Sequence, residues 1–338
     1  MTSKERFYAA LSGKPVDRVP VFPLLMFFAV DRAGMTYRRF ATDGSALAEA
    51  QLNILERFPI DALTVCSDAF RVAADLGGDM AFPENTPPHV TRPLVRSRGD
   101  LLSLRRPDPL KPGSRMADRC AAAAQLARAV SDRCPVLGWV DMPFAEACSA
   151  CGVSEFMMML VDEPALAHEL LEFLTAVVID FALAQHAAGA PMIGAGDAAA
   201  SLISPEMYRQ FALPYERRVC DAVHNAGGTV KLHVCGNTSA LLDDMATCGA
   251  DLFNLDHMVD FARARDVYGR AGKCFKGNLN PVTDMLQATP VQCRNRALEC
   301  LHMARGKAYM LSPGCEVPPG VSDETFMEFC KAPQKIDN

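Results

Sequence analysis

Short apolar runs recur along the chain, and most of them end in a polar or metal-binding residue before a stretch of helical spacing begins. The eight runs lie at residues 19–26, 62–66, 136–140, 192–196, 229–232, 252–255, 274–277 and 308–311. Strands that alternate with helices predict a parallel sheet. Eight such units predict an α/β fold of the closed (β/α)8 type, the TIM barrel.

The residues that follow these runs are the expected active-site residues, because the active site of such a barrel lies at the carboxyl ends of its strands. The candidate catalytic residues, which would orient ligands or take up a proton, are Asp68, Asp197 and Asp256. The candidate substrate-binding residues are Asn278, Met26 and Asp141. An aspartate at such a junction also fits a structural role as the cap of the next helix, and Asn278 also fits a turn.

Two possible metal ligands, His233 and Cys235, lie two residues apart at the end of the fifth run, so an extended backbone places both on one face. Cys315 follows the last run, beside Gly314. One His and two Cys with a fourth position open form the ligand set of a catalytic zinc site. Two thiolates and a neutral imidazole leave bound Zn2+ formally neutral, so the ion can accept and activate a further thiolate.

A structural interpretation of the same residues stays open. Cys235 and Cys315 also fit the role of buried thiols, and His233 that of a hydrogen-bonded core residue. Glu316, next to Cys315, is a possible additional ligand.

The chain is expected to form a single domain over residues 1–338. A helix at about residues 4–11 precedes the first strand and is expected to plug or flank the barrel. The stretch 74–112 is rich in Pro, Gly and charge, and we expect it to form a long excursion over the barrel mouth. Ser204 and Pro205 begin a helix that Pro214 should bend or split.

The composition of the chain limits the classes of partner that it is expected to bind. Half of the 338 residues are hydrophobic, the net charge is -6 and no basic tract is present, which argues against a nucleic-acid partner. No apolar run approaches the roughly 18 residues needed to span a bilayer, so no membrane association is expected. The thirteen cysteines are scattered and odd in number, which indicates free thiols in a reducing, cytoplasmic environment.

Several motifs resemble the uroporphyrinogen decarboxylase superfamily, and in particular its zinc methyltransferase branch, which includes the methylcobamide:coenzyme M methyltransferases. The motifs lie at residues 4–6, 13–20, 202–208, 213–215, 277–281 and 312–315. The resemblance covers nearly the whole chain and implies a (β/α)8 barrel. It also implies that His233, Cys235 and Cys315 hold Zn2+, and that a methyl group moves between a corrinoid and a thiol such as coenzyme M.

Three differences favour the metal-binding branch over the decarboxylases. The decarboxylases carry two arginines in an R-x-x-G-R-Y segment after the first strand, where this chain keeps only Arg32. They have Gly-His-Gly where this chain has Gly314, Cys315 and Glu316, and they lack the H-x-C pair. Asp68 matches an aspartate that the decarboxylases also keep, so it does not separate the branches.

The resemblance implies a partner, a small corrinoid protein that presents its cofactor at the barrel mouth. The sequence has no B12-binding signature of the D-x-H-x-x-G type, so the corrinoid would arrive on another chain or in free form. Three alternatives stay open: a metal-free decarboxylase, transfer from a corrinoid to tetrahydrofolate instead of a thiol, and a metal-storing or regulatory barrel without catalysis.

Overall fold

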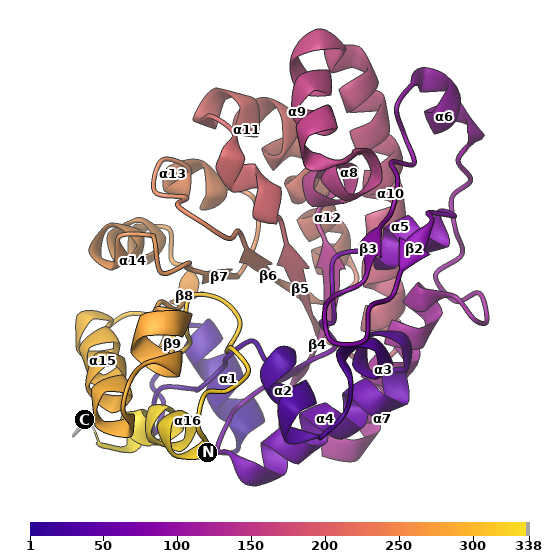
Figure 1. Cartoon of the computed structure of the whole chain (residues 1–338). Helices are drawn as coiled ribbons and strands as arrows, with labels where there is room; N and C mark the ends of the chain where they lie inside the picture. The colour runs from indigo at the N-terminus through magenta and orange to yellow at the C-terminus, as the bar shows by residue number, and fades with distance from the viewer. Residues whose placement is uncertain (336–338) are drawn as a thin grey trace.

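The computed structural model describes residues 1–335, and its centre is a parallel sheet whose seven strands neighbour one another in chain order (Figure 1). Every neighbouring pair of these strands is parallel. The strands are β1 (Leu63–Thr64), β4 (Val136–Asp141), β5 (Met192–Gly196), β6 (Thr229–His233), β7 (Leu252–Asn254), β8 (Cys274–Lys276) and β9 (Tyr309–Met310). This arrangement confirms the predicted α/β barrel class.

The first apolar run, residues 19–26, takes the eighth position without forming a regular strand. Val21 forms a parallel bridge with Leu311, beyond β9. On the other side, the backbone N–H of Asp61, just before β1, donates to the carbonyl of Val21 at 2.8 Å. Pro20 and Pro23 flank this bridge and have no N–H to donate, which limits the run to isolated bridges. The prediction of eight strands is therefore correct for seven, and single bridges close the ring.

Helices surround the sheet on its outer side (Figure 1). They are α1 (Ser3–Leu11), α2 (Phe27–Arg32), α3 (Tyr37–Thr42), α4 (Gly44–Arg57), α5 (Arg71–Asp75), α6 (Arg98–Ser103), α7 (Arg115–Val130), α8 (Pro143–Cys151), α9 (Val153–Asp162), α10 (Pro164–Ala187), η1 (Ala198–Leu202), α11 (Pro205–Phe211), α12 (Leu213–Asn225), α13 (Leu242–Met245), α14 (Phe261–Arg270), η2 (Pro281–Leu286), α15 (Pro290–Met303), α16 (Asp323–Lys331) and η3 (Ala332–Lys335).

Helix α1 closes the amino end of the barrel. Phe7 and Ala10 are buried in one cluster with residues at or next to the starts of the strands, among them Leu137, Met192 and Leu252. Burial of these apolar side chains removes them from water at the end of the barrel where the strands begin. The end that carries the carboxyl termini of the strands is therefore left for chemistry.

A buried carboxylate ties α1 to the first apolar run. The side chain of Asp61 has no exposed surface and accepts hydrogen bonds from Arg6, from Arg18 and from the backbone N–H of Val21, each at 2.7 to 3.0 Å. Two guanidinium groups and one amide therefore satisfy a single buried charge, as such a charge requires.

Local signals set the helix boundaries that the sequence predicts. The Ser204 hydroxyl accepts from the backbone N–H of Met207 at the start of α11. This helix ends at Phe211, and α12 begins again at Leu213 with Pro214 in its first turn. Pro214 therefore splits the helix, as expected.

Residues 74–112 contain a small antiparallel hairpin of β2 (Met80–Ala81) and β3 (His89–Val90), followed by α6. The backbone N–H of Leu94 donates to Ala150 of α8, and Arg98 and Arg106 pair with Glu169 and Asp180 of α10. These contacts place the later part of the segment along the flank formed by α8 and α10 (Figure 1).

No single helix in residues 1–335 has the length and apolar character to cross a membrane alone. Helices α8 and α9 meet the criteria of length and composition only when taken together, and the chain bends by 108° between them.

Candidate metal centre

The structure brings His233, Cys235 and Cys315 together at the carboxyl end of the barrel, and we call them the His–Cys–Cys cluster. One ligand atom of each residue lies within 4.8 Å of the others. Cys235 Sγ lies 3.1 Å from His233 Nε2 and 3.9 Å from Cys315 Sγ. Two sulfurs bonded at about 2.3 Å to one tetrahedral ion would lie about 3.8 Å apart, so the two thiols are spaced as a zinc site requires.

The tautomer of His233 also suits a metal ligand. Its Nδ1 atom donates to the carbonyl oxygen of Asn254, on the neighbouring strand β7, at 3.3 Å. A carbonyl only accepts, so Nδ1 carries the proton and Nε2 keeps a free lone pair facing Cys235. Hydrogen bonds of this kind from the remote ring nitrogen orient most metal-binding histidines.

A close backbone approach holds Cys315 in place. A side chain on Gly314 would put its Cβ 2.3 Å from the backbone nitrogen of His257, so only glycine fits there. The Nδ2 atom of Asn254 donates to the carbonyl of Gly314 at 3.1 Å. Strand β7 and the residues that follow it thus orient ligands on both sides, His233 and Cys315.

Charge is distributed unevenly within the cluster. The hydrogen bond between the two sulfurs lowers the pKa of Cys315, against the effect of burial, and raises that of Cys235. The cluster therefore prefers one thiolate even before a metal supplies charge.

Two buried lysines lie within the barrel near these sulfurs. Lys231 Nζ sits 4.3 Å from the centre of the Trp139 ring, and burial lowers its pKa to about 8, an effect that the nearby cysteines oppose. Lys276 donates to the carbonyl of Phe22 at 2.6 Å, and burial lowers its pKa well below the usual value. Lys231 keeps a pKa above neutral and can therefore offset the negative charge of cysteine thiolates, whereas burial favours the neutral amine of Lys276.

The Glu316 carboxylate binds the backbone where the first apolar run ends and α2 begins. Its Oε1 atom accepts from the backbone N–H groups of Met26 and Phe27 at the start of α2. This oxygen is therefore already occupied by two backbone donors, and the structure assigns it a structural partner. Met26, a predicted substrate contact, is half-buried beside this carboxylate, with its sulfur 3.9 Å from the Tyr37 hydroxyl.

Asp68 forms an ion pair instead of standing free. Both of its carboxylate oxygens accept from Arg115, at 2.8 and 2.7 Å, and Ser67 donates a third bond. Burial acts to raise the pKa of Asp68, but the bonds and charge of Arg115 outweigh it and leave the pKa below its usual range. An acid held ionised in this way is a weak proton acceptor, so the geometry suits an orienting role.

Asp141 belongs to a second buried group with Arg71 and Glu146. Arg71 donates to Asp141, and burial nevertheless raises the pKa of Asp141 to about 6. Nε and Nη1 of Arg71 and both carboxyl oxygens of Glu146 are buried without a hydrogen-bond partner in residues 1–335. Burial, and then the charge of Asp141, raise the pKa of Glu146 well above its usual value.

Asp197 adjoins the cluster through its backbone. Its N–H donates to the carbonyl of His233 at 2.8 Å, while its side chain is fully buried near Glu216. Burial, followed by the charge of Glu216, raises the pKa of Asp197 well above its usual value. Tyr208 donates to Glu216 on its other side. Asp197 is therefore suited to hold a proton and not to carry a charge.

Asp256 and Asn278 lie together, and Asp256 is the predicted aspartate whose charge acts on a cluster thiol. After the Cys315 hydrogen bond and burial, the charge of Asp256 raises the pKa of Cys235. Asn278 Nδ2 donates to the carbonyls of Asp256 and Val259, and its Oδ1 is buried without a partner in the described chain. The strand-end position of both residues matches the prediction.

Sequence reasoning missed the charged groups that lie beside the predicted site residues. The missed residues are the buried Lys231, Lys276, Arg71, Glu146 and Glu216 and the partly buried Arg115. A signal was present for Lys231, because it precedes His233 by two residues and so shares its strand face. Lys276 likewise interrupts an apolar strand.

Comparison with known proteins agrees with this architecture. The model of the uroporphyrinogen decarboxylase (URO-D) family matches residues 2–336. A uroporphyrinogen decarboxylase from Coxiella burnetii (strain Dugway 5J108-111) is 27% identical over 349 residues, covering 98% of this chain and 95% of that protein. The one from Xanthomonas campestris pv. campestris (strain B100) is 30% identical over 302 residues, covering 84% and 83%.

Two solved structures share the fold. A methyltransferase from Methanosarcina mazei superposes with a TM-score of 0.89 at 25% identity, covering 99% of both chains. A B12-independent methionine synthase from Shewanella sp. W3-18-1 superposes with a TM-score of 0.59 at 12% identity, covering 86% of both chains, and shows the fold alone. From the match of the family model over nearly its whole length, the chain belongs to the uroporphyrinogen decarboxylase family.

Proposed function

We propose that the protein is a zinc-dependent methyltransferase that moves a methyl group between a corrinoid and a thiol. The observation that carries the proposal is the convergence of His233, Cys235 and Cys315 within 4.8 Å at the carboxyl end of the barrel. The 25%-identical structural neighbour described as a methyltransferase supports the same reaction class.

The donor set fits Zn2+. Two sulfurs and one imidazole nitrogen are ligands that zinc prefers, and three protein ligands leave a fourth position for substrate. When bound there, Zn2+ would supply a Lewis acid that keeps an incoming thiol as a nucleophilic thiolate at neutral pH.

The chain's own side chains then have distinct tasks. Asn254 fixes the tautomer of His233 through its carbonyl, and Lys231 places a cation near the cysteine sulfurs. The charge of Asp256 acts on Cys235, and Asp256 is the proposed acceptor of the thiol proton. Asp68, held ionised by Arg115, is proposed to orient groups at the mouth of the barrel.

An apolar rim at the barrel mouth supports a large partner. Leu202, Met258, Val282 and Leu286 follow β5, β7 and β8, and each side chain is 41 to 66% exposed. Exposed apolar side chains around one opening mark a surface that another molecule covers. A corrinoid, carried by a separate protein, is the proposed occupant.

The thirteen unpaired cysteines fit a reducing compartment such as the cytoplasm.

The decarboxylase alternative rests on the names of the curated relatives. Uroporphyrinogen carries eight carboxylates, and a site for it needs several free cations. Arg32, the one arginine in the stretch nearest to the decarboxylase segment, donates instead to Asp323 at 2.6 Å and to Asp31 at 2.5 Å. Its charge is therefore already satisfied, which disfavours this alternative.

Two measurements test the proposal. Metal analysis of the purified protein is expected to give close to one zinc per chain. Incubation of the zinc-loaded protein with methylcobalamin and a panel of thiols is expected to change the cobalt absorbance only when a suitable thiol is present.

Reaction with tetrahydrofolate and none of the thiols would support the folate alternative for the methyl acceptor. Zinc binding without any demethylation would favour a storage or regulatory barrel, and decarboxylation of a porphyrinogen by metal-free protein would replace the proposal.

A further inference from the structure

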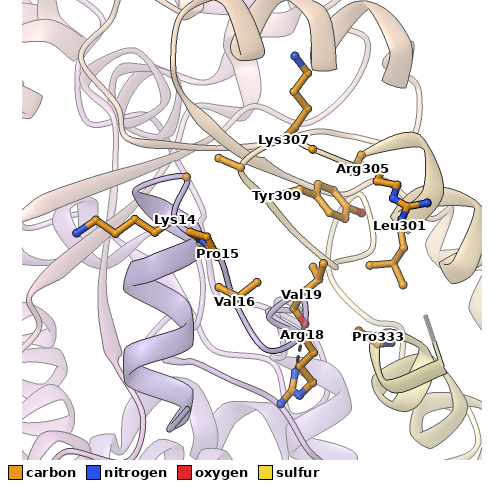
Figure 2. Close-up of a pocket in the computed structure, with 15 residues that line it drawn as sticks. Lys14, Pro15, Val16, Arg18, Val19, Leu301, Arg305, Lys307, Tyr309 and Pro333 are labelled. Atoms are coloured by element: carbon orange, nitrogen blue, oxygen red, sulfur yellow. Dashed lines mark hydrogen bonds between the residues drawn. The ribbon is translucent and has the colours of Figure 1, made fainter. Parts of the chain in front are cut away.

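A cavity of about 410 Å³ lies at the amino end of the barrel, opposite the His–Cys–Cys cluster (Figure 2). Its walls come from the loop after α1, from the C-terminal end of α15 and from the start of β9, where Tyr309 lies. The chemistry proposed for the other end of the barrel makes no use of this space. Its volume is within the range of about 300–1,000 Å³ that is typical of small-molecule sites.

Basic side chains line this cavity, and none of the lining residues within the described range 1–335 is acidic. The basic residues are Lys14, Arg18, Arg305 and Lys307. Arg18 is already neutralised, because both of its Nη atoms donate to Asp61. Within residues 1–335, the charged ends of the other three have no hydrogen bond or ion pair. In a chain of net charge -6, three uncompensated cations around one opening form a local positive potential.

The remaining wall is apolar. Val16, Val19 and Leu301 face the cavity, and Tyr309 contributes its ring while its hydroxyl donates to the carbonyl of Gly277 (Figure 2). A ligand that fits both parts of the lining therefore has an apolar or aromatic body and an anionic end.

Lys14 and Arg305 flank the cavity and are the cations that we assign to that anionic end. Figure 2 shows them on opposite sides of the cavity, with the side chain of Lys14 directed outward, and Lys307 also extends away from it. The ammonium of Lys307 lies near Gly269, 3.1 Å from where a Cβ on that residue would be. The long flexible stems of Lys14 and Arg305 allow their charged ends to turn over the opening.

A simpler explanation is that these cations compensate helix dipoles. Helices α1 and α15 both end at the cavity, and positive side chains are favourable near helix C-termini. That explanation accounts for the charges but not for a cavity with an apolar wall between them. Only a bound ligand uses both features, and the two explanations differ in whether an added anion saturates the site.

We propose that this cavity binds a small phosphorylated metabolite, such as a nucleoside phosphate. Its apolar or aromatic body would pack on the partly exposed Val16 and Val19, and its phosphate oxygens would accept from Lys14 and Arg305. Phosphate is the anion that fits two cations on separate sides, because its several oxygens accept from more than one donor and carry about two charges.

Calorimetric titration of the zinc-loaded wild-type protein tests this at low salt, with ADP, adenosine and inorganic pyrophosphate as probes. ADP is expected to saturate one site per chain and to bind at least tenfold more tightly than either part alone. The double variant Lys14→Gln/Arg305→Gln is expected to weaken ADP binding at least tenfold. The matched variant Arg96→Gln/Lys111→Gln, which removes two exposed cations from the segment 74–112, is expected to change it less than twofold.

Three results would overturn the proposal. The first is the absence of saturable ADP binding to the wild-type protein at 1 mM. The second is equal weakening by the two double variants, which would show only a general effect of charge. The third is equal affinity for pyrophosphate and ADP, which would remove the role of the apolar wall. Zinc content and methyl transfer are measured on the same samples. Neither result depends on whether ADP binds at the amino end of the barrel.

Discussion

The Nδ1 atom of His233 lies 3.3 Å from the carbonyl oxygen of Asn254, on the adjacent strand β7. Parallel pairing of β6 with β7 sets this distance through the backbone. The free lone pair of His233 is thereby fixed on Nε2, facing Cys235. The sheet itself therefore orients the imidazole as the proposed zinc site requires.

Cys315→Ser should remove zinc from the protein. A hydroxyl is a poor zinc ligand at neutral pH, and the loss of one of three ligands should weaken zinc affinity by more than about 100-fold, beyond the usual effect of an outer-shell change. Metal analysis after dialysis against a chelator measures this. Cys120→Ala, which changes a buried thiol of α7 far from the cluster in sequence, should keep its zinc. Equal zinc retention by the two variants would contradict the assignment.

Gly314→Ala should displace Cys315 and weaken zinc binding without changing any ligand. The new Cβ would lie 2.3 Å from the backbone nitrogen of His257, so the loop has to move, at a cost of about 1–3 kcal/mol in stability. Gly99→Ala is the control, because its Cβ would meet no atom closer than 3.6 Å. Urea denaturation and zinc titration on both variants give the comparison. Unchanged zinc affinity in Gly314→Ala would show that the close approach does not position the ligand.

Lys231→Met should shift the pH at which zinc binds. The substitution keeps most of the side-chain volume but removes a buried cation near the cluster sulfurs, so their thiolate forms lose stabilisation. The midpoint pH of zinc binding should therefore rise, by about one unit if the lost interaction resembles that of other close charge pairs. Zinc titration between pH 5 and 8 measures the midpoint, with the exposed Lys111→Met as control. A midpoint that stays in place would assign Lys231 a packing role against Trp139.

The sequence predicted the cluster because its ligands follow a simple rule. His233 and Cys235 share a strand face, and Cys315 lies at another strand end, so alternation and barrel topology together were sufficient. The surrounding charges were not predictable in this way. Asp68 meets Arg115 and Asp141 meets Arg71 across 47 and 70 residues of chain, and such contacts depend on how the helices pack against the strand ends.

The first apolar run shows that sequence patterns have the same limit in predicting the fold. Its apolar residues predicted a strand, and the run does occupy the eighth position of the barrel. Whether it pairs regularly depends on the two prolines and on a buried carboxylate, Asp61, that lies outside the run. The periodicity of apolar residues indicates which side chains of the run are buried. The backbone hydrogen bonds that the run forms depend on residues that lie far away in the sequence.

Glu146→Gln should flatten the dependence of stability on pH. Burial raises the pKa of Glu146 above its unfolded value near 4.5, so the folded state holds a proton that the unfolded state has released. Stability is therefore lost as pH rises above 4.5 toward the folded pKa. Glutamine resembles the protonated acid and does not titrate, so the variant should lose less stability than the wild type between pH 5 and pH 8. Urea unfolding at both values tests this, and the exposed Glu56→Gln should behave as the wild type does.

Asp61→Asn should destabilise the closure of the barrel strongly. The carboxylate is fully buried and is the shared acceptor for Arg6, Arg18 and the backbone N–H of Val21. An amide cannot balance two guanidinium groups, and breaking such a buried pair costs about 3–5 kcal/mol. Asp132→Asn is the matched control, because its pair with Lys4 is exposed to water and contributes little. Thermal and urea unfolding compare the two variants. A cost for Asp61→Asn no larger than that of the control would mean that the first run is held by its apolar contacts alone, and that the carboxylate does not close the ring.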